Sequence, residues 1–353
     1  MSDSVSRRYA GPAITRAISV WGLLVLLILL IIVFSLVLPN TFPTFFNIKS
    51  ILNNKSVQAL VALAVFIPMT ANHFDLSAGF NLGISQVLVI GLQGQGLPWW
   101  GAVIGVLLMG ALVGLVNGVL VTRIKIDSFI ATLGTGTVLY GLNAWYTGGQ
   151  QVLADLPPSF LAISGSIGRV PAPAIYTLVV SFSLWIVFEY LPLGRYLYVL
   201  GASPRTAELN GISARRYVTL GFVAAGTLAS FAGIVLQCQL QIGQSSVGQE
   251  YLLPAFTAAL LGATSIRPGR VNVWGTVLAV AVLAVTVAGL NQLGAPFFVE
   301  PLFNGSMLVL AVGLAVQASQ RRTRRGTEAD RAAAAARALA EGAASKPAEE
   351  IRR

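Results

Sequence analysis

An uninterrupted apolar run near the N-terminus constrains this chain more than any other feature of its sequence. The run covers Ile18 to Leu38, and no charged residue occurs between Arg16 and Lys49. About 20 apolar residues in a helix are enough to cross the hydrocarbon core of a bilayer. A secretory signal has an apolar core of only about 7–15 residues, followed by a cleavage site of small residues. The run is therefore predicted to be a retained transmembrane helix.

The composition extends this prediction to most of the chain. Hydrophobic residues make up 55 % of the 353 residues, charged residues only 10 %, and there are 36 glycines in addition. Soluble domains carry about 25 % charged residues. We therefore expect an all-α polytopic membrane protein.

Nine further apolar segments follow the first run, separated by charges, prolines or polar loops. Together with Ile18–Leu38 they make about ten predicted transmembrane segments: 56–71, 77–92, 99–122, 128–146, 174–191, 217–239, 252–264, 271–291 and 303–318. The segments 56–71, 77–92 and 252–264 are short for a full span of about 20 residues. Broken helices are tolerated where protein or a polar cavity covers the backbone, so eight spans plus re-entrant pieces is the alternative.

The distribution of basic residues predicts the orientation. With ten alternating spans and the N-terminus inside, all but three of the 23 basic residues fall on the cytoplasmic side; the exceptions are Lys49, Lys55 and Arg169. Lys and Arg accumulate in cytoplasmic loops, so both termini are expected in the cytoplasm. The predicted domains are a cytoplasmic segment (1–17), a transmembrane domain (18–319) and a basic, alanine-rich tail (320–353). We expect the tail to be disordered. The net charge of +10 is attributed to this orientation and not to nucleic-acid binding.

The sequence offers little that could support catalysis. It lacks the phosphate-binding loop, the nucleophile elbow and the H-E-x-x-H zinc motif. The single cysteine, Cys238, permits no internal disulfide, and we expect it to be a buried packing residue. One histidine without a Cys/His cluster argues against a metal centre. We therefore predict no enzymatic activity, no metal site and no cofactor in this chain.

A polar stretch, Asn72 to Gly79, interrupts two of the short apolar segments. It contains Asp75, Ser77 and Gly79. Ionisable groups at membrane depth usually face protein or water, so the stretch is one candidate for a break that lines a cavity. The alternative is a short cytoplasmic turn in which Asp75 or Ser77 caps the following helix.

Other polar and small residues lie within the apolar segments themselves. The polar ones are Asn117, Thr132, Thr135, Thr137, Asn143, Gln237 and Gln239. They could line a path for a neutral solute, or they could satisfy neighbouring helices. Three glycines spaced four apart, Gly110, Gly114 and Gly118, form a flat helix stripe. We expect this stripe to pack within the chain, with a dimer interface as the alternative.

The longest predicted cytoplasmic loop, about 192–216, contains a short helix signal. Ser203 followed by Pro204 is typical of an N-cap and a first helical residue, and Gly211 suits the C-terminal cap. The pattern predicts a helix from Pro204 to Asn210 on the cytoplasmic surface. Such a helix could dock into a groove of a soluble partner, or it could be a solvated interfacial helix without one.

Four segments of the chain resemble motifs of ribose/xylose/arabinose-type ABC transporter permeases. The loop Gly201-Ala-Ser-Pro-Arg-Thr-Ala-Glu-Leu-Asn-Gly-Ile212 is similar to the family's G-x-N-x-x-A-A-x-x-x-G-I. Phe74-Asp-Leu-Ser-Ala-Gly79 resembles I-D-L-S-V-G, and Asp127-Ser-Phe-Ile-Ala-Thr-Leu-Gly134 resembles P-F-I-A-T-L-G. Leu261-Gly-Ala-Thr-Ser-Ile266, with Gly269 and Gly275-Thr276, resembles G-G-T-S-x-x-G-G-x-G-x-x-x-G-T. The four motifs occur in family order and cover roughly residues 50–318.

The resemblance implies the membrane-spanning permease subunit of a bacterial ABC importer in the inner membrane. It also implies partners: a second permease copy, a periplasmic solute-binding protein, and a separate ATPase that holds ATP and Mg. The family's coupling role is carried over to eight residues: Ala202, Ser203, Pro204, Arg205, Ala207, Glu208, Gly211 and Ile212. Asp75, Ser77, Gly79, Asn117, Thr132 and Asn143 are the candidates for the pathway or for the structural break.

The expected solute is a sugar or a related polyol, delivered by the binding protein. A branched-chain amino-acid or nucleoside ABC permease is the alternative within the same transport class. An ion-coupled secondary carrier is a third possibility, but it would need buried ionisable groups, and Asp75 is the one acidic candidate away from a segment end. The chain departs from the family at Asn72-His73-Phe74, Asp127-Ser128 and Arg267-Pro268-Gly269.

Overall fold

The computed structural model describes residues 13–313, and this part of the chain is almost entirely helical. The main helices are α2 (Ala13–Val37), α3 (Phe45–Met69), α4 (Ser77–Gly94), α5 (Trp99–Val119), α6 (Ser128–Thr147), α8 (Ala172–Glu189), α9 (Pro192–Ala202), α10 (Pro204–Leu209), α11 (Ala214–Leu240), α12 (Val247–Gly262), α13 (Val273–Gln292) and a final helix Val299–Gly313. The short elements are the π-helical turn η2 (Leu120–Ile124), α7 (Pro158–Leu161), η3 (Ala162–Ser164) and the paired strands β1 (Ser166–Ile167) and β2 (Val170–Pro171). The predicted segment 1–17 and tail 320–353 lie outside the described residues, except for the first turn of α2.

The chain is an all-α polytopic membrane protein. Within residues 13–313, six helices are long and apolar enough to cross a bilayer: α2, α3, α5 extended by η2, α8, α11 and α13. A helix occupies each of the other predicted segments as well, but α12 has only 16 residues, and α4 and α6 carry more polar side chains. The helix predicted at 303–318 begins earlier, at Val299, and its predicted end lies outside the described residues.

The prediction that 56–71 is a short segment is wrong. Helix α3 begins at Phe45 and runs for 25 residues, with the Thr44 side chain accepting a hydrogen bond from the Asn47 backbone amide. The first half of α3 contains polar residues, so an apolar run detects only the second half of the helix. One of them, Lys55, is compensated by an ion pair with Glu300, at 3.1 Å between Nζ and Oε1.

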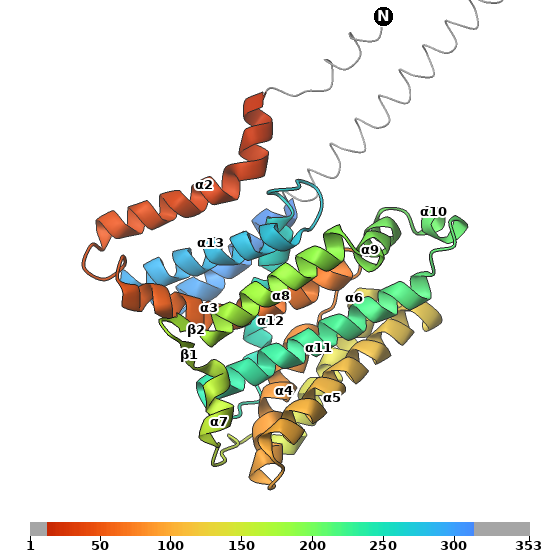
Figure 1. Ribbon diagram of the computed structural model, residues 1–353, viewed down its shortest axis with the longest axis horizontal. Coiled ribbons are helices and arrows are strands. Elements are labelled where there is room, and N and C mark those ends of the chain that lie inside the picture. Colours follow the sequence, from red (N-terminus) through yellow and green to blue (C-terminus); the bar gives the residue numbers. More distant parts are fainter. Residues whose placement is uncertain (1–12, 314–353) are drawn as a thin grey trace, which may run out of the picture.

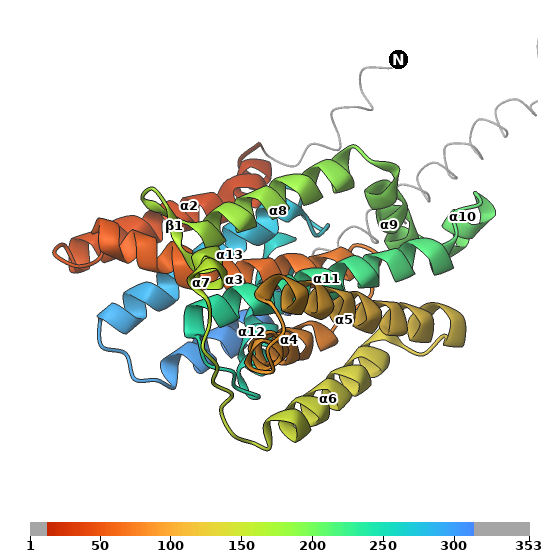
Figure 2. The same cartoon turned by 60° about the horizontal axis from the view of Figure 1, so that its bottom comes forward.

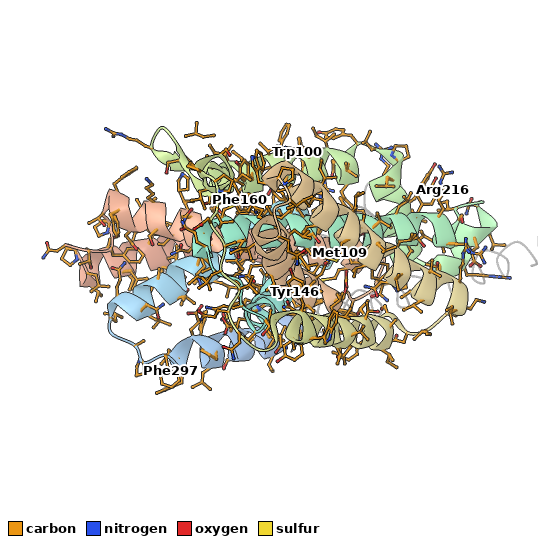
Figure 3. All side chains as sticks on the ribbon, turned by 90° about the horizontal axis from the view of Figure 1, so that it is seen from below. Trp100, Met109, Tyr146, Phe160, Arg216 and Phe297 are labelled. Carbon is orange, nitrogen blue, oxygen red and sulfur yellow. The ribbon has the colours of Figure 1, made fainter. Side chains whose placement is uncertain are left out.

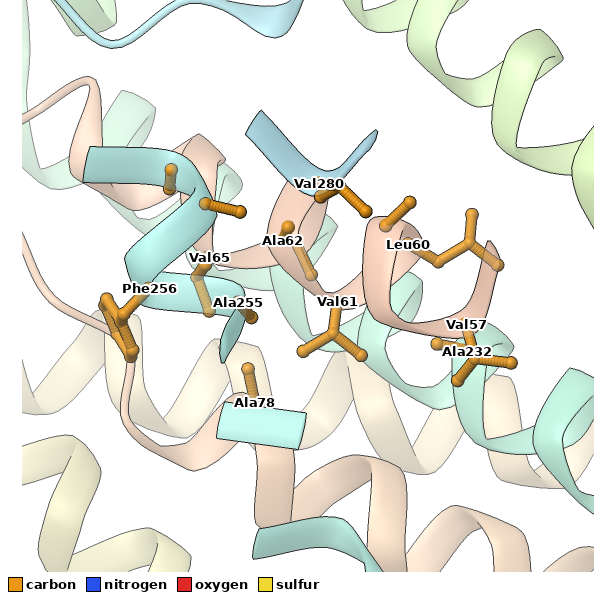
Figure 4. Packing of buried hydrophobic residues seen from close by; sticks show 14 of the residues in the cluster. Val57, Leu60, Val61, Ala62, Val65, Ala78, Ala232, Ala255, Phe256 and Val280 are labelled. Atoms are coloured by element: carbon orange, nitrogen blue, oxygen red, sulfur yellow. The ribbon is translucent and has the colours of Figure 1, made fainter. Parts of the chain in front are cut away.

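Helix α3 forms the centre of the hydrophobic core. Its residues Val57 to Phe66 are all buried, and they contact α4, α11, α12 and α13 (Figure 4). Ala78, Ala232, Ala255 and Val280 approach it from these four helices, and their small side chains allow the helices to pack closely (Figure 4).

The glycine stripe of α5 packs within the chain, which confirms the expectation from its spacing. A Cβ atom at Gly110 would lie 2.6 Å from the Gly226 carbonyl oxygen of α11, and one at Gly114 would lie 2.1 Å from the Phe222 carbonyl oxygen. Gly118 approaches Thr219 of the same helix in the same way. The stripe is therefore occupied by α11 and is not free to form a dimer interface.

The long helices run side by side, and the short helices α9 and α10 project beyond one end of the bundle (Figures 1 and 2). Arg216, at the start of α11, lies at this end, whereas Phe297 lies at the opposite end (Figure 3). The molecule thus has two distinct faces separated by the length of its helices.

Candidate functional site

Two irregular segments, which we call the first and the second break, interrupt the helices of the bundle. The first break, Thr70–Leu76, separates α3 from α4, and the second break, Gln241–Ser246, separates α11 from α12. Each break contains a non-glycine residue in the left-handed conformation, Asn72 with φ 61° and Gln241 with φ 58°. Such conformations cost free energy and persist only where the surroundings impose them.

The helices that follow the two breaks meet at their N-terminal ends. Gly248 of α12 lies against Gly79 and Gly83 of α4, so that a Cβ at Gly248 would be 2.2 Å from the Gly79 carbonyl oxygen and 2.8 Å from the Gly83 Cα. Only glycine permits backbones to approach this closely. The two breaks are therefore joined through one tight contact between α4 and α12.

Buried polar side chains hold the first break in place. Asp75 Oδ1 accepts hydrogen bonds from the Ser77 backbone amide at 3.0 Å and from the Ser77 hydroxyl at 2.6 Å. Asn117 of α5 donates to the same hydroxyl at 2.8 Å. The Thr132 hydroxyl of α6 accepts from the Leu76 amide at 3.0 Å. The break is thus tied to both neighbouring helices, and Asp75 organises the start of α4 through the Ser77 amide.

The second break is held in a similar way from α4 and α6. The Gln86 side chain donates to the Ile242 carbonyl at 2.6 Å and accepts from the Gln244 amide at 3.2 Å. Asn143 of α6 donates to the Ser245 carbonyl at 3.3 Å. Since Gln86 belongs to α4, a displacement of α4 would move both breaks together.

A third polar contact joins α4 to α11, and sequence reasoning missed it. Asn81 donates to the Gly226 carbonyl at 2.8 Å and accepts from the Ser230 hydroxyl at 3.1 Å, and Ser85 donates to Ser230 at 2.8 Å. Ser77, Asn81 and Ser85 are spaced four apart, which places them on one face of α4. That spacing was the available signal for a polar contact surface.

The six candidates for the pathway or the break are all buried. Five of them surround the first break and its contact with α12. The sixth, Asn143, donates to the carbonyl of Ser245 in the second break, 102 positions along the chain. Three oxygen atoms of these candidates, Asp75 Oδ2, Asn117 Oδ1 and Asn143 Oδ1, are buried without a hydrogen-bond partner among the described residues. The geometry therefore places these side chains in contacts between helices, and it places none of them on an exposed wall.

Helix α10 follows the sequence prediction closely. It begins at Pro204 after the N-cap Ser203, whose side chain accepts from the Thr206 amide at 3.4 Å, and Gly211 follows it with φ 75°. Arg205 and Glu208 are exposed and lie 3.8 Å apart. Ala207, one of the eight coupling candidates, is fully buried, so it packs inside the chain and is not available for a partner.

Helix α9 is attached to its end of the bundle at several points. A Cβ at Gly201 would lie 2.3 Å from the Thr70 carbonyl oxygen, so α9 rests directly on the start of the first break. The Tyr198 hydroxyl donates to the Val271 carbonyl at 2.8 Å, and the Arg270 guanidinium lies 3.3 Å from the Tyr198 ring centroid. Burial raises the pKa of the Tyr198 phenol, which keeps it a hydrogen-bond donor. These contacts anchor α9 to the region of the first break, and α10 follows α9 directly in the chain.

An ion pair connects the end of α8 to the loop between α12 and α13. Arg267 donates to both carboxylate oxygens of Glu189, at 2.6 Å for the Nη1 contact. The carboxylate raises the pKa of the Arg267 guanidinium, so the pair stays charged. Among the described residues, no group of three or more His, Cys, Asp and Glu side chains could hold a metal ion.

Comparison with known proteins identifies relatives over most of the chain. A family model described as branched-chain amino acid transport system / permease component matches residues 47–315. The ribose import permease protein of Haemophilus influenzae is 30 % identical over 290 residues, covering 81 % of this chain and 90 % of that protein. The corresponding protein of Bacillus subtilis is 32 % identical over 289 residues, covering 81 % and 89 %.

A more distant relative is named for a different sugar. The D-allose transport system permease protein of Escherichia coli is 27 % identical over 295 residues, covering 83 % of this chain and 90 % of that protein. No solved structure is significantly similar to the chain.

Proposed function

Because the chain belongs to the family of branched-chain amino acid transport system permease components, we propose that it is the permease subunit of an ABC importer for a sugar or related polyol. The ribose and D-allose permeases among its relatives favour a sugar over an amino acid or nucleoside. The protein resides in the bacterial inner membrane, which it crosses several times. Its partners are a periplasmic binding protein that delivers the solute and an ATPase that binds ATP and Mg. A second copy of the permease completes the pathway.

The observation that carries this proposal is the contact between the cytoplasmic helix pair and the first break. The exposed face of α10, with Arg205 and Glu208, is available to a soluble partner. Helix α9 precedes it and rests on the Thr70 carbonyl through Gly201. A force applied to α10 by the ATPase would therefore reach the first break, and through Gly79 and Gly248 it would reach α12.

The same geometry supports ten alternating segments with both termini in the cytoplasm. At the α10 end, the Ser265 hydroxyl donates to the Val20 carbonyl of α2, and Ser128 of α6 accepts from the Phe74 amide. At the opposite end, Gln292 donates to Asn47. The starts of α2 and α6 and the end of α12 thus lie toward one end of the bundle, and the start of α3 and the end of α13 lie toward the other, which agrees with alternating crossings. In this topology α4 and α12 each form only part of a crossing, and the irregular break before each helix spans the rest of the membrane thickness.

Neutral hydrogen-bonding groups suit a sugar pathway because a sugar carries hydroxyls and no net charge. In the conformation described, the amides and hydroxyls at the two breaks are used between helices. We propose that movement of α4 relative to α12 frees some of them toward the solute. A secondary carrier is disfavoured, because it needs buried acidic or basic groups for ion coupling, and Asp75 is the one buried residue of that kind in the described part of the chain.

Charge reversal on α10 tests the coupling role. Glu208→Arg changes an exposed side chain whose partner Arg205 is also exposed, and such pairs contribute little to stability. Membrane insertion and yield should therefore stay normal. Uptake, and stimulation of ATP hydrolysis by loaded binding protein, should fall at least tenfold in the reconstituted complex.

The matched control is Lys125→Glu, a charge reversal at the exposed turn after η2 on the same side of the bundle. It should leave uptake within about twofold of the wild type if α10 is the specific docking element. Normal uptake by Glu208→Arg would remove α10 from energy coupling. Equal losses in both variants would point to a general effect of cytoplasmic charge.

Cysteine labelling tests the topology. Cys238 is buried, with its thiol 3.4 Å from the Phe160 carbonyl oxygen, and it is first replaced by serine. Leu153→Cys and Phe297→Cys should react with an impermeant maleimide from the periplasm, since both side chains are exposed. Leu209→Cys on α10 should react only after the membrane is opened. Periplasmic labelling at Leu209 would overturn the orientation.

A further inference from the structure

An apolar groove lies between α2, α3, α8 and α13, away from the two breaks. Its volume is about 540 Å³, and it is lined by aliphatic side chains such as Ile31, Ile51, Leu178 and Val280. Helix α2 is largely exposed and rests mainly on α13, so the groove lies at the edge of the bundle that faces lipid (Figures 1 and 2). The chemistry of its walls is that of an acyl-chain site.

Basic residues gather at the end of this groove formed by the first half of α3. Lys55 lines the groove but is neutralised by Glu300. In the sequence, Lys49 stands between Ile48 and Ile51, and both isoleucines line the groove. In the described part of the chain, Lys49 forms no ion pair.

Arg169 adds a second uncompensated cation near the same end. It lies in the turn between β1 and β2, and β2 contacts both α3 and α8, which form two walls of the groove. Arg169 is exposed and has no acidic partner among the described residues. The three basic residues outside the predicted cytoplasmic majority thus lie either on α3 or in the turn before β2, which packs against α3 and α8. A positive-inside bias leaves such residues unexplained unless they have a partner of their own.

A hydrogen-bond acceptor is also available in this region. Asn47 lines the groove and accepts at Oδ1 from Gln292, at 2.6 Å. The other amide atom, Gln292 Oε1, is buried and has no partner among the described residues. A headgroup that carries a negative charge would complement the two cations, Lys49 and Arg169.

We infer that the groove binds one anionic phospholipid of the outer leaflet, such as phosphatidylglycerol. One acyl chain occupies the groove, and the phosphate lies near Lys49 and Arg169. The assignment to the outer leaflet rests on the proposed topology, whereas the binding itself does not. A basic residue close to an anionic headgroup contributes about a fivefold change in affinity.

Native mass spectrometry of the purified full chain in mixed micelles tests this inference. The micelles contain equal amounts of phosphatidylglycerol and phosphatidylcholine with the same acyl chains. The wild type should retain one phosphatidylglycerol per chain, in at least fivefold excess over phosphatidylcholine. Lys49→Gln should reduce that excess about fivefold, whereas Lys125→Gln, at the opposite end of the bundle, should leave it unchanged.

A second pair of variants tests the acyl-chain site. Ala281→Trp fills the groove from α13 and should reduce retained lipid at least tenfold. Ala224→Trp is the matched control, because Ala224 is an exposed residue of α11 that does not line the groove. Equal retention of the two lipids by the wild type, or equal loss in the two tryptophan variants, would overturn the inference. Disulfide-linked dimers of Ile31→Cys in a Cys238→Ser background would also overturn it, since they would place a second copy in the groove.

The readout is bound lipid and not transport. A chain that retains phosphatidylglycerol but fails to transport sugar would refute only the proposed function, and the reverse result would refute only the lipid site.

Discussion

Gly248→Ala should be one of the most damaging single-methyl substitutions in the bundle. The added Cβ would lie 2.2 Å from the Gly79 carbonyl oxygen and 2.8 Å from the Gly83 backbone nitrogen and Cα. Non-bonded carbon contacts are optimal at about 3.5–4.0 Å, so α4 and α12 must separate by about 1 Å. The obstructing atoms are backbone and cannot rotate away. Overpacking of this kind costs about 1–3 kcal/mol.

The assay is the thermal unfolding midpoint of the purified protein in detergent, measured beside uptake in cells. Gly134→Ala is the matched control, because a Cβ at Gly134 on α6 has no atom within 4 Å. Replacing glycine by alanine inside a helix contributes about 0.5–1 kcal/mol of stability, so this variant should unfold at an equal or higher temperature. Gly79→Ala should be intermediate, since its nearest obstruction is the Gly248 carbonyl oxygen at 2.8 Å. If Gly248→Ala unfolds at the same temperature as Gly134→Ala, the close contact between α4 and α12 does not exist.

Substitutions at three further positions test hydrogen bonds at the breaks and between α11 and α7. Asp75→Asn keeps an acceptor for the Ser77 amide and should only partly reduce transport. Asp75→Leu removes that acceptor and should lower both assembly and uptake. If Asp75→Asn abolishes uptake in a normally assembled complex, the transport cycle contains a step that depends on the charge of Asp75. Gln86→Leu leaves the Ile242 carbonyl and the Gln244 amide without their partner and should destabilise the protein by about 1–3 kcal/mol, measured as a lower unfolding midpoint; an unchanged midpoint would show that the second break does not depend on Gln86. Cys238→Ser should leave yield and unfolding temperature nearly unchanged, because a hydroxyl can also donate to Phe160, and a marked loss would assign the thiol more than a packing role.

The segments of the membrane domain could be predicted from the sequence because their determinants are local. An apolar stretch of sufficient length must be helical in lipid, since its backbone groups have no other partners. The caps of α10 are equally local: Ser203, Pro204 and Gly211 act within one or two turns of their own positions. The intramolecular glycine stripe of α5 followed from spacing alone, although its partner helix did not.

The start of α3 shows where a local pattern fails. Lys49, Asn53, Asn54 and Lys55 reduce the apolarity of the first half of this helix, so the predicted segment began at residue 56. The helix is stabilised there by contacts that lie far along the chain, such as the pair between Lys55 and Glu300, 245 positions apart.

The sequence by itself therefore determined that the chain is a helical membrane protein, where its apolar stretches lie, and which family motifs it carries. Only the tertiary structure decided which polar side chains meet. Asn81 and Ser230 are 149 positions apart, and Gln86 and Ile242 are 156 apart. A polar residue in an apolar helix indicates that a hydrogen-bond partner must be present, because an unpaired buried polar group costs free energy. The identity of that partner depends on which helices become neighbours, and the packing of all the helices together decides this.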